Sequence, residues 1–173
     1  KRGAAHVVSV DVGRAQFDWS LRNDERVTLL ERTNIVDVPA RVYAGSFDLA
    51  VCDVSFTSIR TILPAVLELL SVDGAFLTLV KPQFEAAPGE VGEGGIVRDP
   101  AVHARVLADT VRLFAASGLA PLDICASPIK GAKGNREFFL LGVRGSRDVD
   151  ALLCHADALA AHVEALTDKA VRL

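Results

Sequence analysis

Short apolar runs of strand length alternate along the chain with segments whose apolar residues recur at helical spacing. The predicted strands are 6–12, 26–33, 47–55, 75–81, 122–129 and 135–144. The predicted helices are 14–23, 57–71 and 100–117, and the last of these begins with Asp99-Pro100, a pair typical of a helix start. Strands that alternate with helices predict an α/β fold with a mostly parallel sheet covered on both faces.

The end of the chain departs from this parallel pattern. The link between 122–129 and 135–144 is too short for a helical crossover, so we expect an antiparallel closing hairpin. Apolar residues recur at helical spacing over 148–168, which predicts a helix that docks on the rest of the protein. We therefore divide the chain into a domain over 1–145 and a C-terminal helical extension over 146–173.

Composition and charge narrow the class of protein. The 173 residues are 50% apolar and 24% charged with a net charge of -3, which is ordinary for a globular protein and gives no global attraction for nucleic acid. Cys52, Cys125 and Cys154 are far apart in apolar surroundings, so we expect buried free thiols in a reducing cytoplasm. No histidine cluster suggests a metal site, and no apolar stretch is long enough to cross a membrane.

Polar residues directly follow several of the predicted strands. In open α/β sheets ligands bind beyond the carboxyl ends of the strands, so these residues are candidates for a site. Asp11 is placed to accept both hydroxyls of a nucleotide ribose, with a helix cap as the alternative. Asn34 is placed to bind an adenine edge, with an ordinary turn residue as the alternative.

Three charged residues form the second candidate group. Asp53 and Lys81 each follow a buried strand, so their side chains meet if the two strands are neighbours, and Pro82 then ends the second strand. The alternative for Lys81 is a side chain that extends into solvent. Glu137 enters an apolar strand and needs a partner, for which Lys81 is the natural candidate. Such a cluster can shift a lysine pKa and handle a hydroxyl proton.

Two loops carry further candidates. Lys130, Lys133 and Arg136 lie at the closing hairpin and suit phosphate contacts, although a solvated turn would have the same composition. The glycine-rich segment 85–99 is either a lid that orders on substrate or a set of turns.

Several motifs together resemble a known family. The segments are VDVGRAQFDWSLRNDERV, LERTN, CDVSF, LVKPQFE, VGEGGIVRDP and SPIKGAKGNREFF. In order and spacing they resemble the hemolysin A-like rRNA methyltransferases of the FtsJ-like superfamily, over about residues 1–145. This resemblance implies a Rossmann-like S-adenosylmethionine-dependent methyltransferase domain that methylates ribose 2′-hydroxyls of ribosomal RNA.

The resemblance also implies roles for individual residues. The superfamily uses a Lys-Asp-Lys-Glu tetrad, and its last three members match Asp53, Lys81 and Glu137. Cofactor binding is implied for Asp11, Val12, Asn34, Ile35 and Asp53. The first tetrad lysine, the first strand and the glycine-rich cofactor loop have no counterpart in this sequence. We therefore expect the chain to be part of a longer one, and the strands that end at Asp11 and Asp53 to have unpaired edges.

The expected activity is methyl transfer in the cytoplasm, with ribosomal RNA or ribosomal subunits as partners. One alternative is a non-catalytic module that binds RNA or a nucleotide. Another is the membrane-active function in the family's historical name, but the 148–168 helix has an acidic polar side, whereas helices that lie on membranes favour basic residues. The sequence leaves the oligomeric state open.

Overall fold

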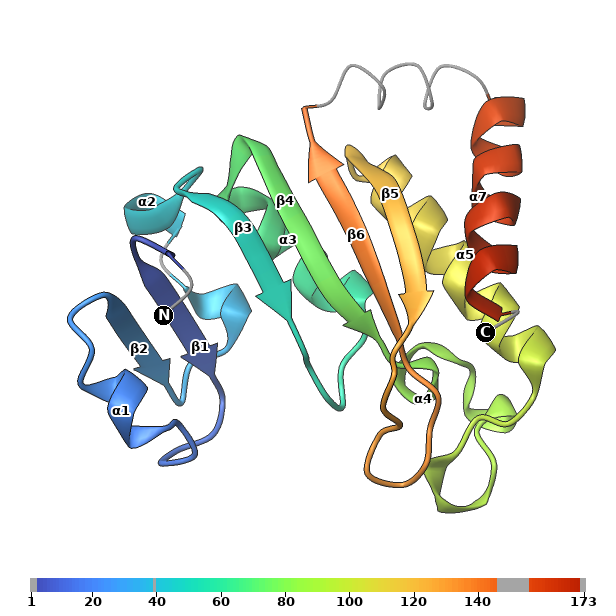
Figure 1. Cartoon of the computed structure of the whole chain (residues 1–173), viewed down its shortest axis with the longest axis horizontal. Helices are drawn as coiled ribbons and strands as arrows, with labels where there is room; N and C mark the ends of the chain where they lie inside the picture. The colour runs from blue at the N-terminus through green and yellow to red at the C-terminus, as the bar shows by residue number, and fades with distance from the viewer. Residues whose placement is uncertain (1–2, 39, 146–155, 172–173) are drawn as a thin grey trace. The chain divides into compact units, whose positions relative to one another are not determined.

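The computed structural model describes residues 3–38, 40–145 and 156–171 (Figure 1). The chain forms two compact units, Lys1–Tyr43 and Ala44–Leu173. The first unit has the sheet β1-β2, and the second has the sheet β3-β4-β6-β5. Among the described residues no strand pairs across the two sheets, so β1 and β3 each have the open edge that the sequence predicted.

The first unit is a small parallel pair of strands with short helices. Its elements are β1 (Val7–Asp11), α1 (Trp19–Arg22), β2 (Val27–Glu31), the 3-10 helix η1 (Ile35–Asp37) and α2 (Ala40–Tyr43). The helix predicted over 14–23 is wrong in its first half. Ala15 has a φ of 59°, which no right-handed helix contains, and Asp18 starts α1 by accepting the Ser20 N–H with its side chain.

The second unit contains the larger sheet. Its elements are β3 (Phe47–Cys52), α3 (Ile59–Leu69), β4 (Leu70–Val80), α4 (Pro82–Glu85), η2 (Pro88–Glu90), η3 (Glu93–Gly95), α5 (Pro100–Ala116), β5 (Leu119–Ala126), β6 (Phe138–Arg144) and α7 (Ala156–Val171). β3 and β4 are parallel, whereas β6 is antiparallel to both β4 and β5. The antiparallel closing hairpin is confirmed, and the sheet is mixed. β4 begins at Leu70, five residues earlier than predicted, because the chain passes directly from α3 into the strand.

The core of the second unit lies between the sheet and two helices. Figure 1 shows α3 and α5 on the same face of the sheet. Alternate residues of β4 are fully buried on this face, and Phe76 among them stacks on Phe114 of α5 with ring centroids 5.4 Å apart. Asp99 caps α5 by accepting the Ala101 N–H, and Pro100 occupies the first turn, as the sequence predicted.

The tail helix α7 docks on the same unit, beside α5 and β5 (Figure 1). Val163, Leu166 and Ala170 are buried in this contact. At the exposed border of this contact, Lys169 Nζ donates a hydrogen bond to Asp123 Oδ1 of β5 at 2.5 Å. The part of the predicted helix over 148–155 lies outside the described residues. No described helix is both long and apolar enough to cross a membrane.

Candidate active site

The ends of two parallel strands bring Asp53 and Lys81 together. Asp53 follows β3 and Lys81 follows β4, and the register pairs Cys52 with Thr78. The Lys81 Nζ lies 2.6 Å from Asp53 Oδ1 and donates a second hydrogen bond to Ser55 Oγ at 3.0 Å. The lysine side chain is only 11% exposed, whereas that of Asp53 is 70% exposed. The ammonium is thus held at the rim of the sheet and does not extend into solvent.

Proline explains why the lysine stays at the strand end. Val80 and Pro82 on either side of Lys81 are buried, and Pro82 occupies the first position of α4. Proline has no N–H to continue the ladder, and its fixed φ suits the first turn of a helix. The chain therefore leaves the sheet immediately after Lys81.

Glu137 lies beside this pair, but its partner differs from the predicted one. The residue lies one position before β6 and is only 8% exposed, and its Oε1 accepts from Gln83 Nε2 at 2.9 Å. The expected ion pair with Lys81 is wrong, because the ammonium is directed to Asp53 and Ser55. The first turn of α4 supplies Gln83 as the donor instead. Gln83 Oε1 is buried without a hydrogen-bond partner, so the amide is oriented by Glu137 alone.

These side chains line one cavity of about 780 Å³ in the second unit. Its walls come from the ends of β3, β4 and β6, from α4, and from the loop between β5 and β6. The lining includes the apolar residues Val51, Leu77 and Phe139. A cavity with apolar walls and a few convergent charged groups is typical of a small-molecule or nucleotide site.

Phe56 is a lining residue that the sequence analysis missed. Its side chain is 92% exposed, and its ring centroid lies 5.2 Å from that of Phe84. Its φ of 62° is left-handed, a conformation that costs a non-glycine residue about 1–2 kcal/mol. Strain of this kind clusters at binding sites. The feature of the sequence that could have identified Phe56 is its position three residues after Asp53, the carboxylate at the end of a strand.

The basic loop forms one side of the cavity. Lys130 and Lys133 are exposed and line it, whereas Arg136 is half-buried and does not. The buried Asn135 holds this loop to the glycine-rich loop, because its Nδ2 donates to Gly95 O at 2.8 Å and its Oδ1 accepts from Val97 N at 3.1 Å. No role for Asn135 was predictable from the sequence, because nothing in the local pattern shows a contact forty residues away.

The predicted cofactor residues other than Asp53 lie in the first unit. Asp11 ends β1, and its Oδ1 accepts the Gly13 N–H at 2.7 Å. Asn34 caps η1 by accepting the Val36 N–H, so the turn role left open for it is present. The Thr33 N–H donates to the Asp11 carbonyl, which places Asp11 and Asn34 at the same end of this sheet.

Two other cofactor candidates adjoin these residues. Val12 is 72% exposed next to Asp11, and Ile35 begins η1. The four residues thus offer a carboxylate, an amide and apolar surface, which fit a ribose and an adenine.

The two cysteines in the described residues, Cys52 and Cys125, differ in how far they are exposed. Cys52 adjoins Asp53, and burial raises the pKa of its thiol to about 11, so it is neutral at physiological pH. Cys125 is a free thiol but is exposed, so the prediction that it is buried is wrong. It lies in the edge strand β5, where alternate side chains point away from the core. Cys154 lies outside the described residues. The described residues contain no group of three or more potential metal ligands.

Comparison with known proteins agrees with this architecture. The fold is that of the S-adenosylmethionine-dependent methyltransferases. The chain superposes on a candidate methyltransferase of this kind from Listeria monocytogenes with a TM-score of 0.59 at 13% identity, over 83% of this chain and 82% of that one. The model of the FtsJ-like methyltransferase family matches residues 1–144, and the chain belongs to this family.

Two relatives with higher sequence identity have different names, one a methyltransferase and the other a hemolysin. The 16S/23S rRNA (cytidine-2'-O)-methyltransferase TlyA of Mycobacterium tuberculosis is 48% identical over 139 residues, which are 80% of this chain and 52% of that protein. A candidate hemolysin of Streptococcus thermophilus has a solved structure with a TM-score of 0.78 at 32% identity, covering 94% of this chain and 61% of that one. The chain therefore spans about half the length of the curated relatives it matches.

Proposed function

We propose that the chain transfers a methyl group from S-adenosylmethionine to a ribose 2′-hydroxyl of ribosomal RNA in the cytoplasm. The observation that carries the proposal is the Lys81 ammonium, held at 2.6 Å from Asp53 in a cavity that also contains Glu137. Membership of the FtsJ-like family and the name of the mycobacterial relative support the same reaction.

Lys81 is the group proposed to act on the attacking hydroxyl. Asp53 and Ser55 fix its ammonium, so a 2′-hydroxyl bound beside it meets a positioned positive charge. This charge favours the alkoxide that develops as the ribose oxygen forms its bond to the methyl carbon and gives up its proton. Glu137, held by Gln83, adds a second carboxylate at the cavity wall that can accept that proton.

The remaining proposed contacts bind the two substrates. Asp11, Val12, Asn34 and Ile35 of the first unit would hold the ribose and adenine of S-adenosylmethionine. The cofactor contact that the family resemblance implies for Asp53 stays a prediction. The cofactor supplies an electrophilic methyl group on a sulfonium. The chain has to exclude water from the transfer and align the hydroxyl, and the apolar residues that line the cavity suit this purpose.

Local charge is proposed to guide the RNA, since the chain is acidic overall. Lys130 and Lys133 line the cavity and can contact phosphates, and Arg136 adds positive charge to the same loop. The exposed ring of Phe56 offers a surface for stacking an unpaired base, as proteins that read single-stranded RNA commonly do.

The test is transfer of tritium from labelled S-adenosylmethionine to ribosomal subunits, using the protein as it is expressed from its natural gene. We expect label in dinucleotides that resist alkali, because a methylated 2′-oxygen cannot assist cleavage of the neighbouring phosphodiester. Label in mononucleotides would mean that a base is the acceptor. No label in either subunit would refute the proposal.

A glycine within the basic loop gives a second test. A Cβ at Gly131 would lie 2.7 Å from Glu137 Oε1, so Gly131→Ala should push the carboxylate away from Gln83. We expect the transfer rate to fall about 10- to 100-fold, because a shift of about 1 Å in a reacting group has effects of that size. The control is Gly89→Ala, where a Cβ meets nothing within 4 Å. Equal rates for the two variants would show that the position of Glu137 is unimportant.

A further inference from the structure

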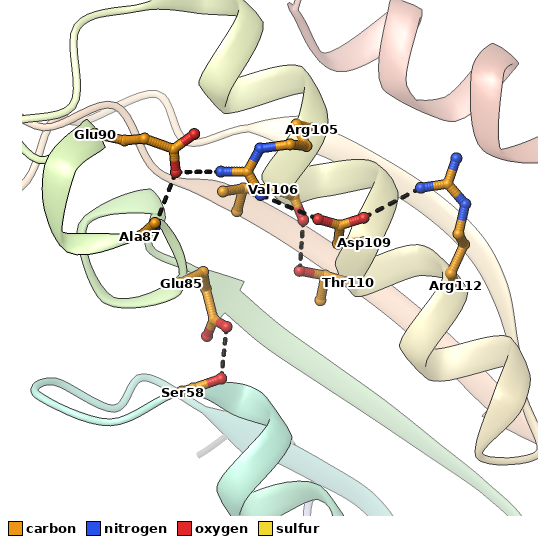
Figure 2. A network of polar contacts seen from close by, with 9 residues as sticks. All are labelled: Ser58, Glu85, Ala87, Glu90, Arg105, Val106, Asp109, Thr110 and Arg112. Atoms are coloured by element: carbon orange, nitrogen blue, oxygen red, sulfur yellow. Dashed lines mark hydrogen bonds and ion pairs between the residues drawn. The ribbon is translucent and has the colours of Figure 1, made fainter.

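Glu85 joins two segments that each carry part of the candidate site. It is the last residue of α4, four positions after Lys81. Its Oε2 accepts from Ser58 Oγ at 2.6 Å, a contact drawn in Figure 2, and its Oε1 accepts from the Ile59 N–H at 2.7 Å. Both carboxylate oxygens therefore accept hydrogen bonds from residues at the start of α3.

These contacts complete the N-terminus of α3. The first N–H groups of a helix have no partner within the helix. Ser58 Oγ accepts the Arg60 N–H at 3.1 Å, and Glu85 takes the Ile59 N–H that the serine leaves unpaired. A negative charge at this end of a helix is favourable. The carboxylate is thus a cap supplied by another segment of the chain.

The loop over residues 53–58 is consequently held at both ends by residues 81–85. At its first end, Lys81 binds Asp53 and Ser55. At its far end, Glu85 binds the residues that begin α3. Between them, the ring of Phe84 contacts that of Phe56.

The Lys81–Asp53 pair needs support of this kind. The Asp53 side chain is 70% exposed, and exposed ion pairs contribute little by themselves. Hydrogen bonds to a partly buried carboxylate are stronger and more directional. The two contacts of Glu85 therefore fix the loop more firmly than the exposed pair can.

We propose that Glu85 is a positioning residue, which sets the placement of Asp53 and Ser55 against Lys81 by anchoring the far end of the loop. The inference rests on the proposed function for its catalytic consequence. Its structural content, the fixed environment of the Lys81 ammonium, can be measured without any methyl transfer.

The surroundings of Glu85 allow its side chain to be truncated without creating an unpaired buried charge. A small cavity of about 100 Å³ adjoins it, lined also by Ser58, Arg60 and residues of α5 that include Asp109 and Thr110. Burial raises the pKa of Glu85, and the hydrogen bonds from Ser58 and Ile59 oppose this shift. Truncation of the side chain therefore removes both hydrogen bonds and leaves the Ile59 N–H without this acceptor, but it adds no new buried charge.

Glu90 provides a matched control in the same stretch of chain. It accepts the Ala87 N–H at 2.9 Å and pairs with Arg105 of α5, so it also makes two polar contacts (Figure 2). Neither contact involves the 53–58 loop. Glu85→Ala and Glu90→Ala thus remove a comparable side chain, and only the first releases the loop.

The experiment measures two quantities in both variants. The first is the acetylation rate of Lys81 by trace acetic anhydride, followed by mass spectrometry. We expect this rate to rise in Glu85→Ala, because the ammonium loses its fixed partners, and to stay at the wild-type value in Glu90→Ala. The second is methyl transfer, for which Glu85→Ala should lower kcat about 10- to 100-fold.

Glu85→Gln adds a conservative variant with the same shape. Its amide can still accept the Ile59 N–H, so both readouts should fall between those of wild type and Glu85→Ala, and it decides the matter if the alanine variant does not fold. Wild-type acetylation and kcat in Glu85→Ala, or equal changes in Glu90→Ala, would overturn the inference. If wild-type protein transfers no methyl group, the proposed function fails, and the acetylation rates still decide the role of Glu85.

Discussion

Lys81→Ala should abolish methyl transfer and leave cofactor affinity nearly intact. The substitution removes the only ammonium that the described residues place against Asp53, so no positioned charge remains beside the attacking oxygen. General acid–base and electrostatic contributions of this kind are worth about 10²- to 10⁴-fold in rate. We expect a loss at the upper end of that range, measured by tritium transfer at saturating cofactor.

The matched control is Lys169→Ala. Lys169 also forms an ion pair, with Asp123, but it lies on α7 and does not line the cavity. Its removal should leave kcat unchanged. Full activity in Lys81→Ala would end the proposed mechanism, and loss of cofactor binding in this variant would assign the lysine to binding instead.

Gly142→Ala should destabilise the second unit by overpacking its core. Gly142 lies opposite Phe76 in the pairing of β4 with β6, and a Cβ there would lie 2.6 Å from the ring of Phe114. That ring is fully buried and stacked on Phe76, so it has no free space to enter. Overpacking of a dense core costs about 1–3 kcal/mol, and we expect the upper part of this range from urea unfolding.

A double-mutant cycle separates this clash from other effects. Phe114→Ala alone removes the ring and should cost about 3–5 kcal/mol. Adding Gly142→Ala to that variant should cost almost nothing more, because the new methyl group enters vacated space. Strictly additive free energies of unfolding would show that the glycine acts through its backbone and not through the ring.

The sequence was sufficient for the central geometry of the site because that geometry follows from strand periodicity. Asp53 and Lys81 each terminate a buried strand, and the carboxyl ends of neighbouring parallel strands meet at one edge. Only the adjacency of the two strands had to be assumed. The docked tail helix was predictable for a similar reason, since its apolar stripe repeats with the helical period.

The contacts missed by the sequence analysis all depend on short irregular segments. Gln83 replaces Lys81 as the partner of Glu137 because α4 is a single turn whose direction no periodic pattern encodes. Phe56 was missed because its left-handed backbone is imposed by the loop around it. Glu85 was missed because the N–H that it satisfies is 26 residues away in the sequence.

The two free edges of the larger sheet are unequal in their tendency to recruit another extended chain. At β5, Pro121 lacks an N–H, the pairing shifts between Pro121 and Asp123, and α7 lies alongside with His162 bonded to the Pro121 carbonyl at 2.6 Å. At β3 the pairing with β4 also shifts, between Phe47 and Leu49, but this strand contains no proline, and Leu49 and Val51 project exposed apolar side chains. Aggregation by strand addition in concentrated solution should therefore begin at β3, and a charged residue at position 49 should suppress it.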